Sequence, residues 1–155
     1  MLFRSVRLWK LGTAELLALL PHPNAGWVAF DPSGEHLASA ARDGTVKIWT
    51  REGKLYNQFA AHGQLSSSPS FSGDGKLLAV GTAEGLVEVR DVQSGRTVML
   101  DSHHGASVNS VAFLPGDPSR LISASDDTTV AQFSCPACTD PDGVIREAVE
   151  WAKGH

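Results

Sequence analysis

The sequence predicts an all-β fold that is assembled from repeats of one small antiparallel sheet. The first observation is a turn-type motif that recurs about every 40 residues, at 30–34 (FDPSG), 71–75 (FSGDG) and 113–117 (FLPGD). The second is an alternating segment that recurs at the same interval, at 46–49 (VKIW), 87–90 (VEVR) and 130–133 (VAQF), with a fainter copy at 6–9 (VRLW). A chain that repeats itself in this way builds the same structural unit several times.

Each repeat contains short β-type segments in a fixed order. A first segment ends in the turn motif, and a small apolar run follows at 37–40 (LASA), 78–81 (LAVG) and 121–124 (LISA). A turn rich in Gly and Asp comes next, then the alternating segment, and then a fourth strand. Such runs form antiparallel hairpins, and alternation places one side chain inward and the next outward. The small apolar run is typical of a strand that is covered on both faces. Four strands in about 40 residues predict a propeller blade.

Taken as a set, these motifs resemble the WD-repeat β-propeller family. A third shared feature is a histidine nine residues before the turn phenylalanine, which His62 and His104 satisfy, whereas His22 lies one residue closer. The similarity covers residues 6–133. It implies a partial WD-repeat β-propeller of about three to three and a half four-stranded blades. We expect a half blade at 1–21, blades at 22–61 and 62–102, and a three-stranded blade at 103–134, all within a repeat region of 1–134.

The resemblance also implies a hydrogen-bond network in each blade that links a histidine, a serine or threonine, an aspartate and a tryptophan. In the first blade these are His22, Ser39, Asp43 and Trp49. The second blade offers His62 and Thr82, with Glu84 and Arg90 in place of the acid and the aromatic. The third keeps His104 and Asp127, with Phe133 unable to donate. Loss of Asp43 is expected to cost roughly 1–3 kcal/mol, because buried donors would lose their acceptor.

For function, the resemblance implies a non-catalytic scaffold that binds a protein or peptide. The expected partner-binding face consists of Arg42, Gln64, Ala83, Ser107 and Asp126. We expect no enzyme and no cofactor, because Gly-x-Ser-x-Gly, His-Glu-x-x-His and paired acidic metal motifs are absent from the sequence.

The predicted strands do not add up to a closed ring. About thirteen strands are expected, whereas a propeller of four blades, the smallest typical ring, needs about sixteen. The chain is then either the C-terminal part of a longer propeller or a half-ring that closes as a homodimer. We favour the longer propeller, because proteins avoid unpaired sheet edges exposed to solvent. In the dimer, moreover, residues 6–9 would not belong to any blade.

Composition narrows the remaining classes of function and location. The net charge of −4 and the scattered basic residues indicate no nucleic-acid partner. No apolar run is long enough for a membrane span. Arg4, Arg7 and Lys10 precede an apolar stretch as in an export signal, but Glu15 interrupts that stretch. Two cysteines are too few for a disulfide scaffold, which favours reduced thiols and a cytoplasmic protein.

The tail at 135–155 departs from the repeat. Cys135 and Cys138 form a Cys-x-x-Cys motif, a weak candidate for a zinc half-site or a redox pair, although two packed thiols are the simpler interpretation. Asp140 and Pro141 are suited to start a helix. One helical face then carries the apolar residues Val144, Ile145, Ala148, Val149 and Ala152. The tail resembles the C-terminal end of bacterial propeller-bearing signal-transduction ATPases, which would make this chain the sensor end of such a protein.

Overall fold

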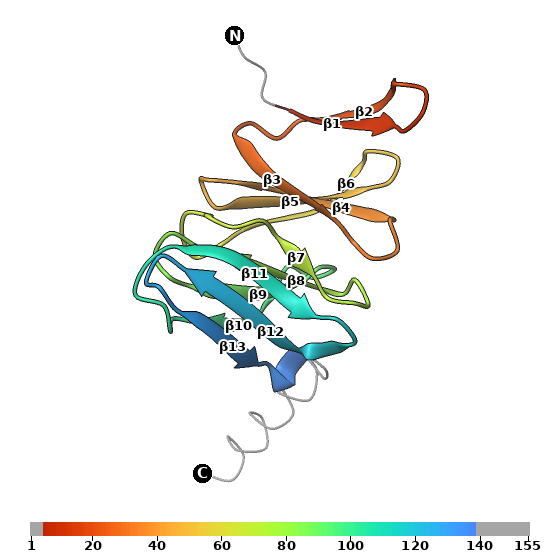
Figure 1. Cartoon of the computed structure of the whole chain (residues 1–155). Helices are drawn as coiled ribbons and strands as arrows, with labels where there is room; N and C mark the ends of the chain where they lie inside the picture. Colours follow the sequence, from red (N-terminus) through yellow and green to blue (C-terminus); the bar gives the residue numbers. More distant parts are fainter. Residues whose placement is uncertain (1–4, 139–155) are drawn as a thin grey trace.

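The computed structural model describes residues 5–138, which form thirteen β-strands and one 3-10 turn. The strands make four antiparallel sheets of two, four, four and three strands in chain order, and within each sheet every strand pairs with its neighbours in sequence (Figure 1). The expected all-β class and partial propeller are therefore confirmed.

We name the sheets by their strands. The half blade is β1 (Val6–Lys10) with β2 (Glu15–Leu20). Blade 1 is β3 (Ala25–Phe30), β4 (His36–Ala41), β5 (Thr45–Thr50) and β6 (Leu55–Ala60). Blade 2 is β7 (Ser70–Phe71), β8 (Leu77–Gly81), β9 (Val87–Asp91) and β10 (Thr97–Asp101). Blade 3 is β11 (Val108–Leu114), β12 (Asp117–Ser125) and β13 (Val130–Ser134), followed by the turn η1 (Pro136–Cys138).

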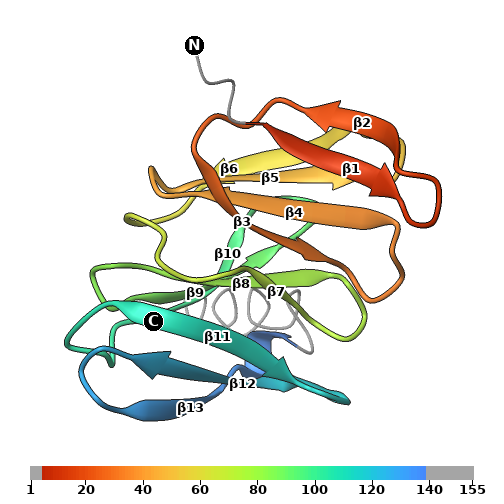
Figure 2. The same cartoon turned by 45° about the horizontal axis from the view of Figure 1, so that its top comes forward.

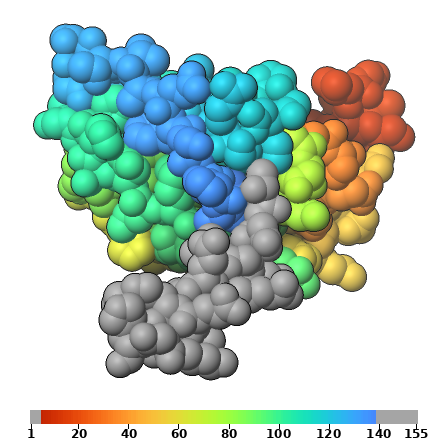
Figure 3. All heavy atoms as spheres, turned by 90° about the horizontal axis from the view of Figure 1, so that it is seen from below, coloured from red at the N-terminus to blue at the C-terminus, as the bar shows by residue number. Residues whose placement is uncertain are grey.

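The blades lie side by side in chain order, each with one face against the next (Figures 1 and 2). Three apolar clusters fill the spaces between them. Leu20, Leu37 and Trp49 join the half blade to blade 1. Val46 and Ile48 meet Leu78 and Val80 between blades 1 and 2. Between blades 2 and 3, Val87 and Val89 meet Val108 and Phe113. The half blade and β13 consequently lie at opposite ends of the molecule (Figure 3).

The small apolar runs are buried on both faces only in the inner blades. Every residue of β8 is buried, as is every residue of β4 after His36. In β12, by contrast, Leu121 and Ser123 are buried but Ile122 is 41% exposed. The expectation of two covered faces was wrong for 121–124, because no described sheet covers the outer face of blade 3.

Two further elements differ from expectation or fall outside the description. The first strand of blade 2 is short, because Pro69 has no N–H for a ladder bond; an isolated bridge between Leu65 and Thr82 precedes it. The amphipathic helix expected from Asp140 onward lies outside the described residues. Within 5–138, no helix has the length and apolar character needed to cross a membrane.

Candidate interaction surface

In blade 1, a buried serine brings together two of the predicted network residues. Ser39 Oγ lies 2.6 Å from His22 Nδ1 and accepts a hydrogen bond of 2.8 Å from Trp49 Nε1. His22 and Ser39 are buried, and Trp49 is buried in the cluster against the half blade. Burial, followed by the nearby Lys47 ammonium, lowers the pKa of His22, which keeps the imidazole neutral.

Asp43 does not bond His22 directly, as the resemblance implied, but reaches it through Thr45. Its Oδ1 accepts bonds from the Thr45 hydroxyl at 2.6 Å and the Thr45 amide at 3.0 Å, and Thr45 Oγ1 lies 2.9 Å from His22 Nε2. The Thr45 hydroxyl bond, first among several, lowers the pKa of Asp43. The next residue after His22 is Pro23, which has no N–H to offer the carboxylate. Asp43 therefore acts through Thr45, on an exposed turn.

Blade 3 joins the corresponding residues directly. His104 Nε2 lies 2.6 Å from Ser123 Oγ, and His104 Nδ1 lies 2.9 Å from Asp127 Oδ2. Gly105 supplies the N–H that Pro23 lacks, at 2.9 Å from Asp127 Oδ2. Asp127 also receives the Thr129 hydroxyl at 2.6 Å, the main cause of its lowered pKa. Phe133, in the position of the tryptophan, meets His104 only edge to face, with ring centroids 6.3 Å apart.

Blade 2 contains a network that sequence reasoning missed. His62 Nδ1 lies 3.0 Å from Glu88 Oε1, and the His62 amide donates to Glu88 Oε2. Arg90 Nε donates to the same Oε1 at 2.5 Å, and another guanidinium nitrogen donates to the carbonyl of Ala60 on blade 1. Glu88 is fully buried. The sequence analysis did not include Glu88 in the network, because strand alternation alone does not show that blade 1 also covers this face of β9.

The other two expected members of the second network are placed differently. Thr82 is buried, and its hydroxyl accepts a 3.1 Å bond from the Leu86 amide within the β8–β9 turn. Glu84 accepts from the amide of Gln64 at 3.1 Å. Glu84 thus bonds the loop before β7, and the acid that bonds His62 is Glu88. The clue in the sequence was the pair Glu88 and Arg90, two opposite charges on one face of a strand.

The five residues of the expected partner face lie on loops at the same end of the blades. Arg42, Ala83 and Asp126 lie on the turns after β4, β8 and β12, at the left in Figure 1. The Ala83 amide donates to the Gln64 carbonyl at 2.8 Å, and the Asp126 amide donates to the Ser107 carbonyl at 2.9 Å. All are exposed except Ser107, which is partly buried.

An open groove of about 360 Å³ connects blade 1 to blade 2 at this end. It is lined by Asn24, Ala25, Gly26, Arg42, Asp43 and Gln64. Arg42 and Gln64, from neighbouring blades, thus border one depression. The polar lining, with one guanidinium and one carboxylate, suits hydrogen bonds to a polypeptide.

The cysteines are joined rather than free. Cys135 and Cys138 form a disulfide, so the expectation of two reduced thiols was wrong, and their sulfurs cannot ligate zinc in this state. Among residues 5–138, no group of three or more His, Cys, Asp or Glu is arranged to hold a metal ion.

Comparison with known proteins agrees with the repeat. The family model "WD domain, G-beta repeat" matches residues 16–50 and 95–134. These two ranges contain the whole blade 1 network, from His22 to Trp49, and the whole blade 3 network. The interval between them contains Glu88 and Arg90, which form the divergent network of blade 2.

Several curated proteins are similar to this chain. WD repeat-containing protein SL1-17 of Schistosoma mansoni is 33% identical over 131 residues, which cover 83% of this chain and 43% of that protein. Actin-interacting protein 1 of Drosophila melanogaster is 32% identical, with coverages of 69% and 18%. U3 small nucleolar RNA-associated protein 15 of Saccharomyces cerevisiae is 27% identical, with coverages of 95% and 29%. The chain therefore spans less than half the length of each of these relatives.

A solved structure supports the fold alone. The computationally designed Ika4 protein superposes with a TM-score of 0.73 at 22% identity, over 84% of this chain and 79% of that one. The similarity of the tail to bacterial signal-transduction ATPases is not borne out by the comparisons.

Proposed function

Because the chain belongs to the WD-repeat family, we propose that it is a non-catalytic scaffold that binds a protein or peptide at the loop end of its blades. The observation that carries this proposal is the anchoring of the loops. Asp43 with Thr45 and Asp127 with Thr129 fix the turns that follow Arg42 and Asp126. A partner would meet a preformed surface and would pay little ordering entropy.

Charge reversal at the loop end tests this function. Arg42→Glu, combined with Asp126→Arg, is expected to abolish capture of partners by the full chain, measured by affinity purification and quantitative mass spectrometry. Arg96→Glu is the matched control, because Arg96 is exposed on the turn after β9, at the opposite end of the blades. Equal partner sets for both proteins would contradict the assignment of the surface.

We further propose that the chain is the C-terminal portion of a larger propeller. β1 corresponds to β5 by the repeat. Within 5–138, however, no strand pairs with the inner edge of β1, where β5 pairs with β4. Among the described residues, blade 3 likewise has no fourth strand beyond β13. Two inner strands at one end and one outer strand at the other would complete these sheets. The short coverage of the relatives fits this proposal.

The alternative is a ring closed by two copies of this chain. Its weakness is geometric: β1 of one copy and β13 of the other compete for the same position in the shared blade. Sedimentation equilibrium distinguishes the two proposals. A dimer that saturates and grows no further favours the two-chain ring, whereas the larger propeller predicts weak association of open ends without a defined stoichiometry.

A cytoplasmic location stays a prediction. The disulfide removes one argument for it, because disulfides persist chiefly in oxidising compartments. Fractionation of cells that make the protein, with a tag on the full chain, measures the location directly.

A further inference from the structure

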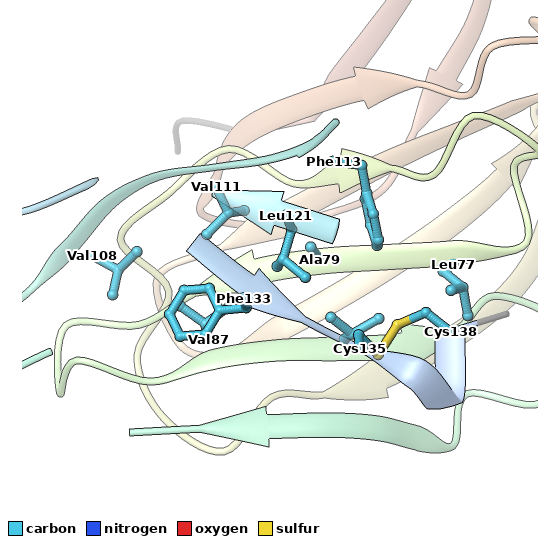
Figure 4. Packing of buried hydrophobic residues seen from close by; sticks show 11 residues of the cluster. Leu77, Ala79, Val87, Val108, Val111, Phe113, Leu121, Phe133, Cys135 and Cys138 are labelled. Carbon is cyan, nitrogen blue, oxygen red and sulfur yellow. A yellow bond between two sulfur atoms is a disulfide. The ribbon is translucent and has the colours of Figure 1, made fainter. Parts of the chain in front are cut away.

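The disulfide lies at the junction of blades 2 and 3. Cys135 follows β13 immediately, and Cys138 closes the turn η1. The two residues are 2% and 7% exposed, and they belong to the apolar cluster that fills this junction, together with Leu77 of β8, Phe113 of β11 and Leu121 of β12 (Figure 4).

The turn that carries the disulfide touches both blades. The Cys135 amide donates to the Ser119 carbonyl at 2.7 Å, which ties the turn to β12 in blade 3. η1 also contacts β10, where Val98 and Met99 pack against the same cluster. The Cys138 amide donates back to the Cys135 carbonyl at 2.9 Å. A disulfide across this turn holds it in the shape that makes both contacts at once.

Blade 3 needs such a connection more than the inner blades do. Blades 1 and 2 each have a sheet on both sides, whereas blade 3 meets another described sheet on one face only. On its free side Ile122 is 41% and Val130 is 73% exposed. Its attachment therefore depends on the apolar cluster at this junction, on the contacts of β11 with β7 and β8, and on the turn η1.

We propose that the Cys135–Cys138 disulfide is a redox-sensitive latch that holds blade 3 against blade 2. A dithiol reductant such as dithiothreitol opens it: the S–S bond accepts two electrons and two protons to give two thiols, and the reductant's sulfurs join in a cyclic disulfide. Because both sulfurs are buried, attack requires η1 to detach first. Once reduced, the turn is free to unwind, and the contact with β10 weakens.

The expected size of the effect follows from the small ring that the disulfide closes. Constraining four residues, from Cys135 to Cys138, shifts the opening equilibrium of the turn by roughly 20-fold in the chain-entropy description. This effect is local, so it is expected to appear in the junction and not in blade 1.

Native-state hydrogen exchange of the full chain, read by mass spectrometry of peptides, tests the latch. With dithiothreitol, peptides covering β10, β12 and β13 are expected to exchange about 20-fold faster. Peptides covering β3 to β6 are expected to be unchanged. The control is Cys135→Ser combined with Cys138→Ser, which should exchange like the reduced protein and show no response to dithiothreitol.

Three results would overturn the proposal. One is an unchanged exchange rate at the junction after complete reduction, verified by alkylation and mass. Another is an equal increase in all four sheets. The third is rapid alkylation of both cysteines in the native protein without any reductant. The readout involves no partner, so its failure leaves the proposed scaffold function standing, and failure of that function leaves the latch standing.

Discussion

Three residues at equivalent repeat positions show how one network tolerates substitution. Trp49 donates to Ser39, Arg90 donates to Glu88, and Phe133 donates nothing and only meets His104 edge to face. In each case the buried polar atoms of the blade still have partners, and no buried side-chain nitrogen or oxygen within 5–138 is left without one. Because an unpaired buried polar group costs free energy, a new donor at this position requires an acceptor that matches it, whereas Phe133 brings no donor and leaves Ser123 bonded to His104. Tryptophan with serine and arginine with glutamate are two such matched pairs.

The blade 1 geometry predicts that Ser39 matters more than Asp43. Ser39→Ala leaves the Trp49 N–H and the His22 ring without their shared hydroxyl, and it is expected to lower the free energy of unfolding by about 2–3 kcal/mol. Asp43→Ala removes an exposed anchor of Thr45 and should cost about 1 kcal/mol, the lower limit of the value expected from sequence. Urea denaturation measures both. An equal or larger loss for Asp43→Ala would place the carboxylate inside the network.

His22 predicts a dependence of stability on pH. Its pKa in the folded chain lies below the ordinary 6.5, so below pH 6.5 the unfolded chain binds a proton that the folded chain rejects. The contribution of His22 to the free energy of unfolding is at its full value above pH 6.5. It declines as the pH falls, by at most about 1.4 kcal/mol at pH 5.5. Denaturation of wild type and His22→Gln between pH 7.5 and 5.5 measures it. A variant with the same slope would show that His22 is not responsible.

Glu88 and Arg90 predict a strong coupling. Glu88→Ala leaves the Arg90 guanidinium without its carboxylate partner, and the Arg90 side chain is only 11% exposed. The substitution is therefore expected to lower the free energy of unfolding by about 3–5 kcal/mol. Glu88→Leu combined with Arg90→Leu removes both charges and should recover most of that loss. A double-mutant cycle of Glu88→Leu, Arg90→Leu and the pair, measured by urea denaturation, gives the coupling energy. If the single and double variants are equally unstable, the pair contributes packing and not charge neutralisation.

At the scale of the element, the sequence identifies strands well and their surroundings less well. Alternation in 87–90 correctly separates Val87 and Val89 from Glu88, because side chains alternate across any strand. It cannot show that a neighbouring blade covers the second face as well, since that contact joins residues distant in sequence. The same limit explains Ile122: its run matches those of β4 and β8, but no sheet among the described residues covers its face, so it remains 41% exposed.

Gly81 lies where β8 of blade 2 closely approaches β11 of blade 3. A Cβ added there would lie 2.5 Å from Val108 Cγ1, on β11 of the next blade. Gly81→Ala is therefore expected to cost about 1–3 kcal/mol through overpacking of the junction. Gly26→Ala is the matched control, because a Cβ at Gly26 in β3 meets nothing within 4 Å. Thermal unfolding compares the two. A Gly81→Ala protein as stable as the control would mean that β8 and β11 separate without cost.

At the scale of the molecule, the repeat predicts the order of the sheets and the incomplete ring. It could not predict the disulfide, because the spacing of Cys135 and Cys138 also suits reduced thiols, and only the packing of η1 in the junction brings them together. Nor could the repeat predict which apolar residues are exposed on the half blade and on blade 3, the two terminal sheets. On β2, Ala18 and Leu20 face blade 1, while Leu17 and Leu19 remain 53% and 58% exposed.

The exposed apolar faces of the half blade and of blade 3 predict that the chain associates with itself. Unpartnered apolar sheet faces bind one another in water, so sedimentation velocity should show a weight-average mass that rises with concentration. Leu17→Lys combined with Leu19→Lys is expected to suppress that rise with less than about 0.5 kcal/mol change in stability, because both side chains are already exposed. The control is the same pair changed to Met, which keeps the face apolar and should still associate. If the lysine variant associates as strongly as wild type, the half blade is not the contact, and the exposed face of blade 3, with Ile122 and Val130, must supply it.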